Sequence, residues 1–450
     1  MREGSLEAPV RHPIDWQSPD FWDEAKLDAE LRRAFDICAG CRRCFNLCDS
    51  FPRLFDLVDA SPDEVHGVKS ADFGPVVDAC TLCDMCFLTK CPYVPPHEFN
   101  LDFPHLMVRA RAVAAKKNGV PFGVRQITET DRNGKIGCST AALSNWAGKR
   151  GNALTRPLME ATLGVHRDAE LPAFAPETLE RQSRRMSLTR DTTAPAAQAG
   201  RKAAVFATCF ANYNATAIGA AALEVLAKNG VEAELVYPGC CGMPQLEQGD
   251  LARVSEAAVN AAAAFKPWIE DGYDVVSLTP SCSLMLKFEW PLIVPGDHPA
   301  HADVKKLAAA TFDVSEYMVD LARRHGLAPG MKPLPGDVFM HVACHSRAQN
   351  FGQKGVEMLR LIPDVKVQVA ERCSGHGGSF GVLKDTFEVA LKVGRPVARQ
   401  AAEKKAAFVV SECPLARDHI VQGAERLDED SGPVESARHP IELLARAYRG

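Results

Sequence analysis

The sequence of 450 residues lacks several features that would assign a protein to a common class. It has no run of 18 uncharged apolar residues, so no membrane-spanning helix is expected. The first residues, MREGSLEAPVRHPIDW, have no apolar core and no small-residue cleavage site, which argues against a secretory signal. The net charge is only −5 and no basic cluster stands out, so nothing indicates nucleic-acid binding. The absence of GxGxxG and P-loop motifs leaves the chain without an evident flavin or nucleotide site.

Cysteine, by contrast, is abundant, with 16 in the chain. Without a secretion signal we expect a cytoplasmic protein, in which cysteines are metal ligands or redox groups more often than disulfides. Eight of them form a duplicated run, in which the second copy follows the first by 42 or 43 residues. The two copies are Cys38, Cys41, Cys44, Cys48 and Cys80, Cys83, Cys86, Cys91.

This duplication predicts two [4Fe–4S] clusters. A C-x2-C-x2-C run wraps three thiolates around one cluster, and in two-cluster ferredoxins the fourth cysteine of each run binds the other cluster. The predicted ligands are therefore Cys38, Cys41, Cys44 and Cys91 for cluster one, and Cys80, Cys83, Cys86 and Cys48 for cluster two. Ligation within each run is the alternative for the fourth ligand, and structural zinc is the alternative for the metal. Cys86 and Cys91 are separated by one residue more than the motif has, which predicts a bulged turn.

Six further cysteines form a longer repeat with separations of 135, 133 and 131 residues. Cys209, Cys240 and Cys282 correspond to Cys344, Cys373 and Cys413. An apolar, strand-like segment precedes each one, and amphipathic helical segments lie between the strands. The predicted strands are 203–208, 233–237, 274–278, 338–343, 365–370 and 406–411. Alternating strands and helices predict parallel sheets, with all six cysteines at the carboxyl ends of the strands, where open α/β sheets place their sites.

The expected fold is therefore α+β and multidomain. An α-helical, ferredoxin-like two-cluster domain covers residues 19–118, with a helix start at Ser18 and Pro19, and a helical or linker region covers 119–199. Two tandem α/β domains with parallel sheets cover 200–327 and 336–450.

The long-repeat cysteines are candidate ligands for a further cluster or another metal, and a redox dithiol or buried structural cysteines are the alternatives. The first half offers four thiols, Cys209, Cys240, Cys241 and Cys282. The second half offers only Cys344, Cys373 and Cys413, with His345 and His376 beside them, and is the weaker candidate. The isolated Cys138 is expected to be a small apolar side chain rather than a ligand.

Four segments carry a resemblance to a known family. GCCGMPQLEQGD (239–250) resembles the signature of the cysteine-rich CCG domain. The segments that look like its second copy are MHVACHSRAQNFG (340–352), CSGHGGSFG (373–381) and HPIELLA (439–445). Two ferredoxin-type motifs before two such domains resemble the catalytic subunit of heterodisulfide reductase. They also resemble the iron–sulfur subunits of anaerobic glycerol-3-phosphate dehydrogenase and of glycolate and lactate oxidation systems.

In heterodisulfide reductases each CCG domain supplies C…CC…C-x-x-C to a noncubane cluster that cleaves a disulfide. Here Thr279 stands where the first cysteine of C-x-x-C belongs, and in the second half Ser374 and Val410 replace two further cysteines. The resemblance therefore implies an electron-transfer subunit more than a disulfide reductase.

The predicted function is an oxidoreductase subunit that relays single electrons between a redox partner, expected to be a flavoprotein dehydrogenase, and a quinone or other acceptor. A heterodisulfide-reductase-like enzyme and a non-catalytic sensor or docking protein are the alternatives. Association with the inner face of the membrane, through a partner, is compatible with a chain without a transmembrane segment.

Overall fold

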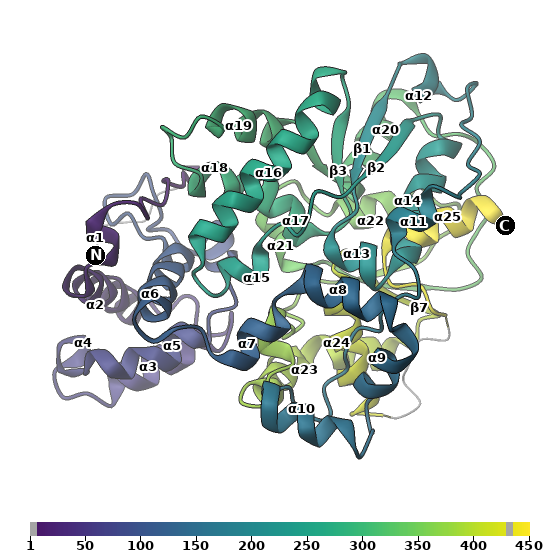
Figure 1. The fold of residues 1–450 in the computed structure, drawn as a ribbon. Helices are drawn as coiled ribbons and strands as arrows, with labels where there is room; N and C mark the ends of the chain where they lie inside the picture. Colours follow the sequence, from purple (N-terminus) through teal and green to yellow (C-terminus); the bar gives the residue numbers. More distant parts are fainter. Residues whose placement is uncertain (1–6, 429–434) are drawn as a thin grey trace.

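The computed structural model describes residues 7–428 and 435–450, and its N-terminal part is entirely helical (Figure 1). Within those ranges no helix is both long and apolar enough to cross a membrane. The N-terminal elements are α1 (Pro19–Trp22), α2 (Glu24–Cys41), α3 (Ser50–Asp59), α4 (Glu64–Gly67), η1 (Ser70–Phe73), α5 (Gly74–Asp78), η2 (Cys86–Lys90) and α6 (Phe103–Asn118).

The predicted helix start at Ser18 is confirmed, because the Ser18 hydroxyl accepts a hydrogen bond from the amide of Asp20 and Pro19 is the first helical residue. This first helix is short and ends at Trp22. The chain breaks at Asp23, whose extended backbone ends α1 and whose carboxylate caps α2 by accepting from the amides of Ala25 and Lys26.

The two halves of the long repeat each contain a parallel sheet, as the alternating pattern predicts. The first sheet has the order β2-β1-β3-β4 and the second β6-β5-β7. The strands are β1 (Lys202–Phe206), β2 (Glu232–Val236), β3 (Asp274–Ser277), β4 (Thr311–Asp313), β5 (Val338–His341), β6 (Val367–Ala370) and β7 (Phe408–Ser411). In register, Ala203 pairs with Ala233 and Asp274.

Strand β4 was not predicted from the sequence. It has only three residues and pairs Thr311 with Val275 at the edge of the first sheet, and the described residues of the second half contain no counterpart. So short a strand has no alternating pattern to detect, and it exists because β3 offers it an edge.

Helices cover the sheets and connect the strands. In the first half they are α13 (Cys209–Tyr213), α14 (Thr216–Lys228), α15 (Met243–Leu246), α16 (Leu251–Glu270), α17 (Pro280–Leu284), η3 (Met285–Glu289), α18 (Trp290–Ile293), α19 (His301–Ala310) and α20 (Val314–His325). In the second half they are α21 (Cys344–Ala348), α22 (Lys354–Leu359), η4 (Gly378–Gly381), α23 (Phe387–Lys404), α24 (Pro414–Glu425) and α25 (Pro440–Arg449).

Residues 119–199 form short helices joined by extended segments. They are α7 (Phe122–Ile127), α8 (Thr130–Ser139), α9 (Ala141–Gly148), α10 (Thr155–Leu163), α11 (Leu179–Ser183) and α12 (Pro195–Gln198). Helix α8 packs against α13 of the first half. The segment after α10 contacts the second half: the His166 ring stacks on Phe387 of α23, and the Glu170 amide donates to the Gln422 side chain of α24. This region therefore contacts both halves of the long repeat.

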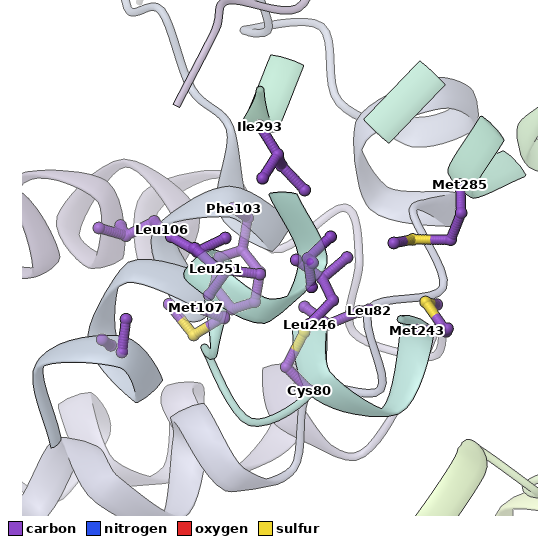
Figure 2. Close-up of a cluster of buried hydrophobic side chains, with 14 of the residues drawn as sticks. Cys80, Leu82, Phe103, Leu106, Met107, Met243, Leu246, Leu251, Met285 and Ile293 are labelled. Atoms are coloured by element: carbon purple, nitrogen blue, oxygen red, sulfur yellow. The ribbon is translucent and has the colours of Figure 1, made fainter. Parts of the chain in front are cut away.

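The hydrophobic cores are continuous across the segments of the chain. One core joins the N-terminal helices to α15, α16 and α18, with Phe103 and Met107 of α6 near Leu246 and Leu251 (Figure 2). At this contact Gly249 has φ 75°, and a Cβ there would lie 2.3 Å from the Ala112 amide nitrogen, so glycine is needed. A second core joins the two sheets through α14 and α25.

Candidate functional site

The first thiol group consists of Cys38, Cys41, Cys44 and Cys91. Burial raises the pKa of Cys38, and the neighbouring thiols of Cys91, Cys44 and Cys41 raise it further because like charges repel. The fold therefore brings Cys91 of the second cysteine run beside three cysteines of the first.

The second thiol group consists of Cys80, Cys83, Cys86 and Cys48. Burial raises the pKa of Cys48, and the nearby thiols of Cys83 and Cys80 add to the rise. The pKa of Cys86 is also raised, by burial and then by its neighbours Cys83, Cys80 and Cys48. Each group thus combines three cysteines of one run with the last cysteine of the other.

Local backbone conformation directs these side chains inward. Leu82 and Asp84 have φ values of 48° and 59°, in the left-handed region that non-glycine residues rarely adopt. The additional residue between Cys86 and Cys91 is accommodated by the π-helical turn η2, in which the Cys91 amide donates to the Cys86 carbonyl at 2.9 Å. The predicted bulge is therefore a single π turn.

Both groups suit an iron–sulfur cluster chemically. Burial and the repulsion between neighbouring thiolates both disfavour loss of the thiol protons. A positively charged iron–sulfur core compensates this cost when it binds the sulfurs. Backbone amides already face the sulfurs: those of Ser50 and Phe51 lower the pKa of Cys48 against the larger effect of burial. Amides of Tyr93 and Val94 do the same for Cys91, where burial again dominates. Within the described ranges, no three His, Cys, Asp or Glu side chains are arranged for a single metal ion.

The first-half group consists of Cys209, Cys240, Cys241 and Cys282 at the carboxyl ends of β1, β2 and β3. The sulfurs of Cys209 and Cys240 lie 3.9 Å apart. Hydrogen bonds with Cys209 and Cys241 lower the pKa of Cys240, whereas the pKa values of Cys209 and Cys241 are raised, in each case chiefly by their hydrogen bond with Cys240. The thiols of this group are therefore close enough to one another to interact directly.

Asp131, which the sequence analysis did not identify, holds the loop that carries Cys240. One carboxylate oxygen accepts from the Cys240 amide at 2.9 Å, and the other accepts from the Tyr237 hydroxyl. On the other side of the loop, Trp290 Nε1 donates to the Cys241 carbonyl at 3.0 Å. A chain distance of 109 residues separates Asp131 from Cys240, so no local pattern could reveal the pair.

The second-half group consists of Cys344, Cys373 and Cys413 at the ends of β5, β6 and β7. Burial raises the pKa of Cys344, and the neighbouring sulfurs of Cys83, Cys373 and Cys413 raise it further. Cys83 in turn has its pKa raised to about 12 by burial and then by Cys373. The second-half group therefore adjoins the second thiol group.

Of the two histidines beside the second-half cysteines in the sequence, His345 lies at this junction. His345 Nε2 hydrogen-bonds the Leu82 carbonyl at 3.1 Å, which fixes α21 against the loop between Cys80 and Cys83. Burial lowers the pKa of His376 to about 3, and His376 Nε2 is buried without a hydrogen-bond partner among the described residues.

The positions that depart from the C-x-x-C pattern are buried. The Thr279 hydroxyl lies 3.3 Å from the Thr208 hydroxyl, Val410 is inside β7, and Ser374 Oγ accepts from the His376 amide at 3.3 Å. The lone Cys138 is also buried, as predicted, and its thiol donates to the Tyr213 carbonyl at 3.4 Å.

An ionic network joins the second thiol group to the first half. Arg11 donates to Asp84 at 2.9 and 3.0 Å, to Asp102 at 2.8 and 3.1 Å, and to Glu289 at 2.7 Å. His105 Nε2 lies 2.9 Å from Glu289, and although burial and Arg11 lower its pKa, Asp102 and Glu289 raise it overall. Asp84 lies between Cys83 and Cys86, so this network fixes the loop that carries them.

Comparison with known proteins identifies the long repeat. The sequence profile of the family described as CCG, cysteine-rich domain, matches residues 203–287 and 338–415. These segments contain the strands and thiols of both halves.

Curated relatives extend the similarity. One subunit of the anaerobic glycerol-3-phosphate dehydrogenase of Escherichia coli K12 is 26% identical over 326 residues, which cover 71% of this chain and 76% of the relative. Lactate utilization protein A of Geobacillus thermodenitrificans is 31% identical over 211 residues, 45% of this chain and 80% of the relative. One subunit of the CoM/CoB fumarate reductase of Methanothermobacter marburgensis is 28% identical over 256 residues, 55% of this chain and 47% of the relative.

Proposed function

The chain belongs to the family of CCG-domain iron–sulfur oxidoreductase subunits, and from this premise we propose that it relays single electrons between a redox partner and an acceptor. The proposed partner is a flavoprotein dehydrogenase, and the proposed acceptor is a quinone or another oxidant. Two relatives are named as subunits, one of a dehydrogenase and one of a reductase, which supports a multi-subunit context.

The proposed carriers are two [4Fe–4S] clusters, one on the first and one on the second thiol group. The first-half group, with four thiols, is proposed to hold a third centre, and the second-half group remains the weaker candidate. When bound, such clusters supply one-electron chemistry at potentials that the protein tunes by burial, charge and hydrogen bonds to sulfur. The chain's contribution is the buried thiols, the amides that face them and the rigid loops that carry them.

The observation that carries this proposal is the proximity of the thiol groups to one another: the charge of Cys86 in the second group interacts with that of Cys44 in the first. Cys83 is close enough to Cys373 and Cys344 for their charges to interact. A relay needs its centres adjacent and fixed, and the His345 hydrogen bond to Leu82 meets the second requirement.

An exposed surface on the region 119–163 supports docking to the partner, which we propose to lie at the inner face of the membrane. Leu143, Trp146 and Leu154 are 64%, 52% and 76% exposed, although side chains of this kind are normally buried. Lys149 extends from the end of α9 beside them and is exposed as well.

The test is to purify the protein anaerobically, quantify iron and sulfide, and titrate its EPR signals against potential. Two clusters correspond to about eight irons per chain, and a third [4Fe–4S] centre raises this to about twelve. We expect Cys83→Ser to remove about four irons and Cys138→Ser, as the matched control, to remove none. Bound zinc without sulfide would overturn the proposal.

The same preparation tests disulfide reduction as the second candidate function. The first half retains four thiols, which is the arrangement such an enzyme would need. Turnover of low-molecular-weight disulfides with an artificial donor, lost in Cys241→Ser, would establish that function. Turnover unchanged by this substitution would reject it.

A further inference from the structure

A polar cavity of about 300 Å³ reaches the first-half group at Cys240. Three elements form its walls. Residues 129–131 at the start of α8 form one wall, the loop Pro238–Gly242 forms the second, and the face of α16 that carries Arg253, Glu256 and Asn260 forms the third. The region 119–199 thus contributes directly to the surroundings of this thiol group.

The cavity has a negative charge. Its lining includes Glu129, Asp131 and Glu256, and Arg253 is the single cation among the lining residues. Arg253 is already paired with Glu129 at 2.6 and 3.0 Å, so it offers little charge to an incoming ligand. The lining therefore has two more carboxylates than cations, and this net negative charge attracts a cationic ligand.

This lining selects the chemistry of a ligand. Anions such as carboxylates, phosphate esters and acidic disulfides are repelled by this net negative charge. Apolar lining is restricted to Pro238, Ala257 and Ala261, too little to bury a prenyl tail. Asn260 and Gln245 supply amide groups that donate and accept hydrogen bonds.

We propose that this cavity is a binding site for a small, polar, cationic or neutral one-electron carrier, which exchanges electrons with the centre on the first-half group. If the first-half group holds its centre, a carrier bound in this cavity would exchange one electron with it in either direction, with no bond made or broken and no proton moved. The inference deepens the proposed function and rests on its third centre. It also places a quinone with a long tail at another site.

The experiment compares two viologens as probes. The methyl viologen radical is cationic, whereas the radical of its bis(sulfopropyl) analogue is anionic, and both share one chromophore. Freeze-quench EPR measures how fast the viologen radical reduces the centre, identified by the signal that Cys241→Ser removes. At low ionic strength we expect the cation to react about tenfold faster than the anion, and added salt to shrink the difference.

Variants of α16 locate the reaction. Glu256→Gln should lower the cation-to-anion ratio, and Asn260→Trp should slow both probes by about tenfold because it obstructs the cavity. Glu270→Gln, on the same helix but outside the cavity, is the matched charge control and should change neither rate.

Rates that Asn260→Trp leaves unchanged, or an anion that reacts as fast as the cation, would overturn the inference. A chain with about eight irons and no Cys241-dependent signal would instead refute the third centre of the proposed function, and this is known before any viologen is added.

Discussion

Replacing Arg11 by methionine tests whether the N-terminal segment fixes the loop of the second thiol group. Methionine keeps much of the length of the side chain but removes the cation. Asp84, Asp102 and Glu289 then lose a guanidinium that contacts all three, and only His105 remains to offset their charge.

The burial of these side chains determines how much stability the variant loses. The Arg11 side chain is 11% exposed and that of Glu289 is 3% exposed, so the variant leaves buried carboxylates without their guanidinium partner. Removing one partner of a buried ion pair costs about 3–5 kcal/mol. With an unfolding entropy of about 2.1 cal/mol/K per residue, 450 residues that unfold together correspond to a fall in Tm of roughly 3–5 °C. The core shared by the N-terminal helices and the first half favours one transition.

The assay is anaerobic calorimetry of the cluster-loaded protein at pH 8 and pH 5.5. Without Arg11 the carboxyl pKa values rise, so protonation at the lower pH relieves the repulsion and the difference in Tm should shrink. In the loaded protein we also expect a lower reduction potential for the centre on the second thiol group, since a nearby cation has been removed. Arg11→Lys should restore most of the potential, because it keeps the charge, but less of the Tm.

Lys117→Gln is the matched control, because Lys117 pairs with Glu24 at the surface, where both side chains are more than half exposed. Such pairs contribute about 0–1 kcal/mol, so its Tm should change by less than about 1 °C. If Arg11→Met behaves like this control and its potential is unchanged, the network does not hold the loop and the reasoning fails.

Three further predictions concern ligation, pH and packing. If the fourth ligands are exchanged between the runs, Cys91→Ser combined with Cys41→Ser loses one cluster, leaving about four irons on these two groups, whereas Cys91→Ser with Cys83→Ser loses both; iron analysis giving the opposite result would establish ligation within each run. Burial raises the pKa of Glu412 from 4.5 to about 8, so as the pH rises the unfolded chain loses this proton at a lower pH than the folded chain does. The free energy of unfolding therefore falls as the pH rises between these two values. Glu412→Gln should therefore match the parent in denaturation near pH 5 and exceed it near pH 8; a constant difference would argue against this origin. Leu246→Ala, in the core that joins α6 to the first half, should cost about 2–5 kcal/mol in calorimetry, and a loss below 1 kcal/mol would show that this contact is dispensable.

The sequence predicted the repeated architecture well because its signals are local. Apolar segments followed by cysteine predicted six strands, and all six occur in parallel sheets with the cysteines just beyond their carboxyl ends. Helix α6 likewise has local signals at both ends, with Pro104 in its first turn and Gly119 at its C-terminal end. The grouping of Cys48 and Cys91 with the opposite runs remains a ligation hypothesis, although the fold brings these thiols together.

Long-range contacts were not accessible in the same way. The expected helical or linker region 119–199 supplies Asp131 to the loop of Cys240, and the N-terminal segment supplies Arg11 to the loop of Cys83. Neither residue has a neighbour in sequence that suggests such a role. The proximity of Cys83 to Cys344 and Cys373 likewise joins residues about 260–290 positions apart.

The sequence by itself therefore determined the type of chemistry and the elements that carry it, because cysteine spacing and hydrophobic periodicity act over a few residues. Tertiary structure alone decided which thiols lie together, where a cavity reaches them, and which charges surround them. The physical reason is that burial and Coulomb interactions depend on distance in space. Residues such as Arg11, Asp131 and Glu256 acquire their roles only when the chain has folded around the thiols.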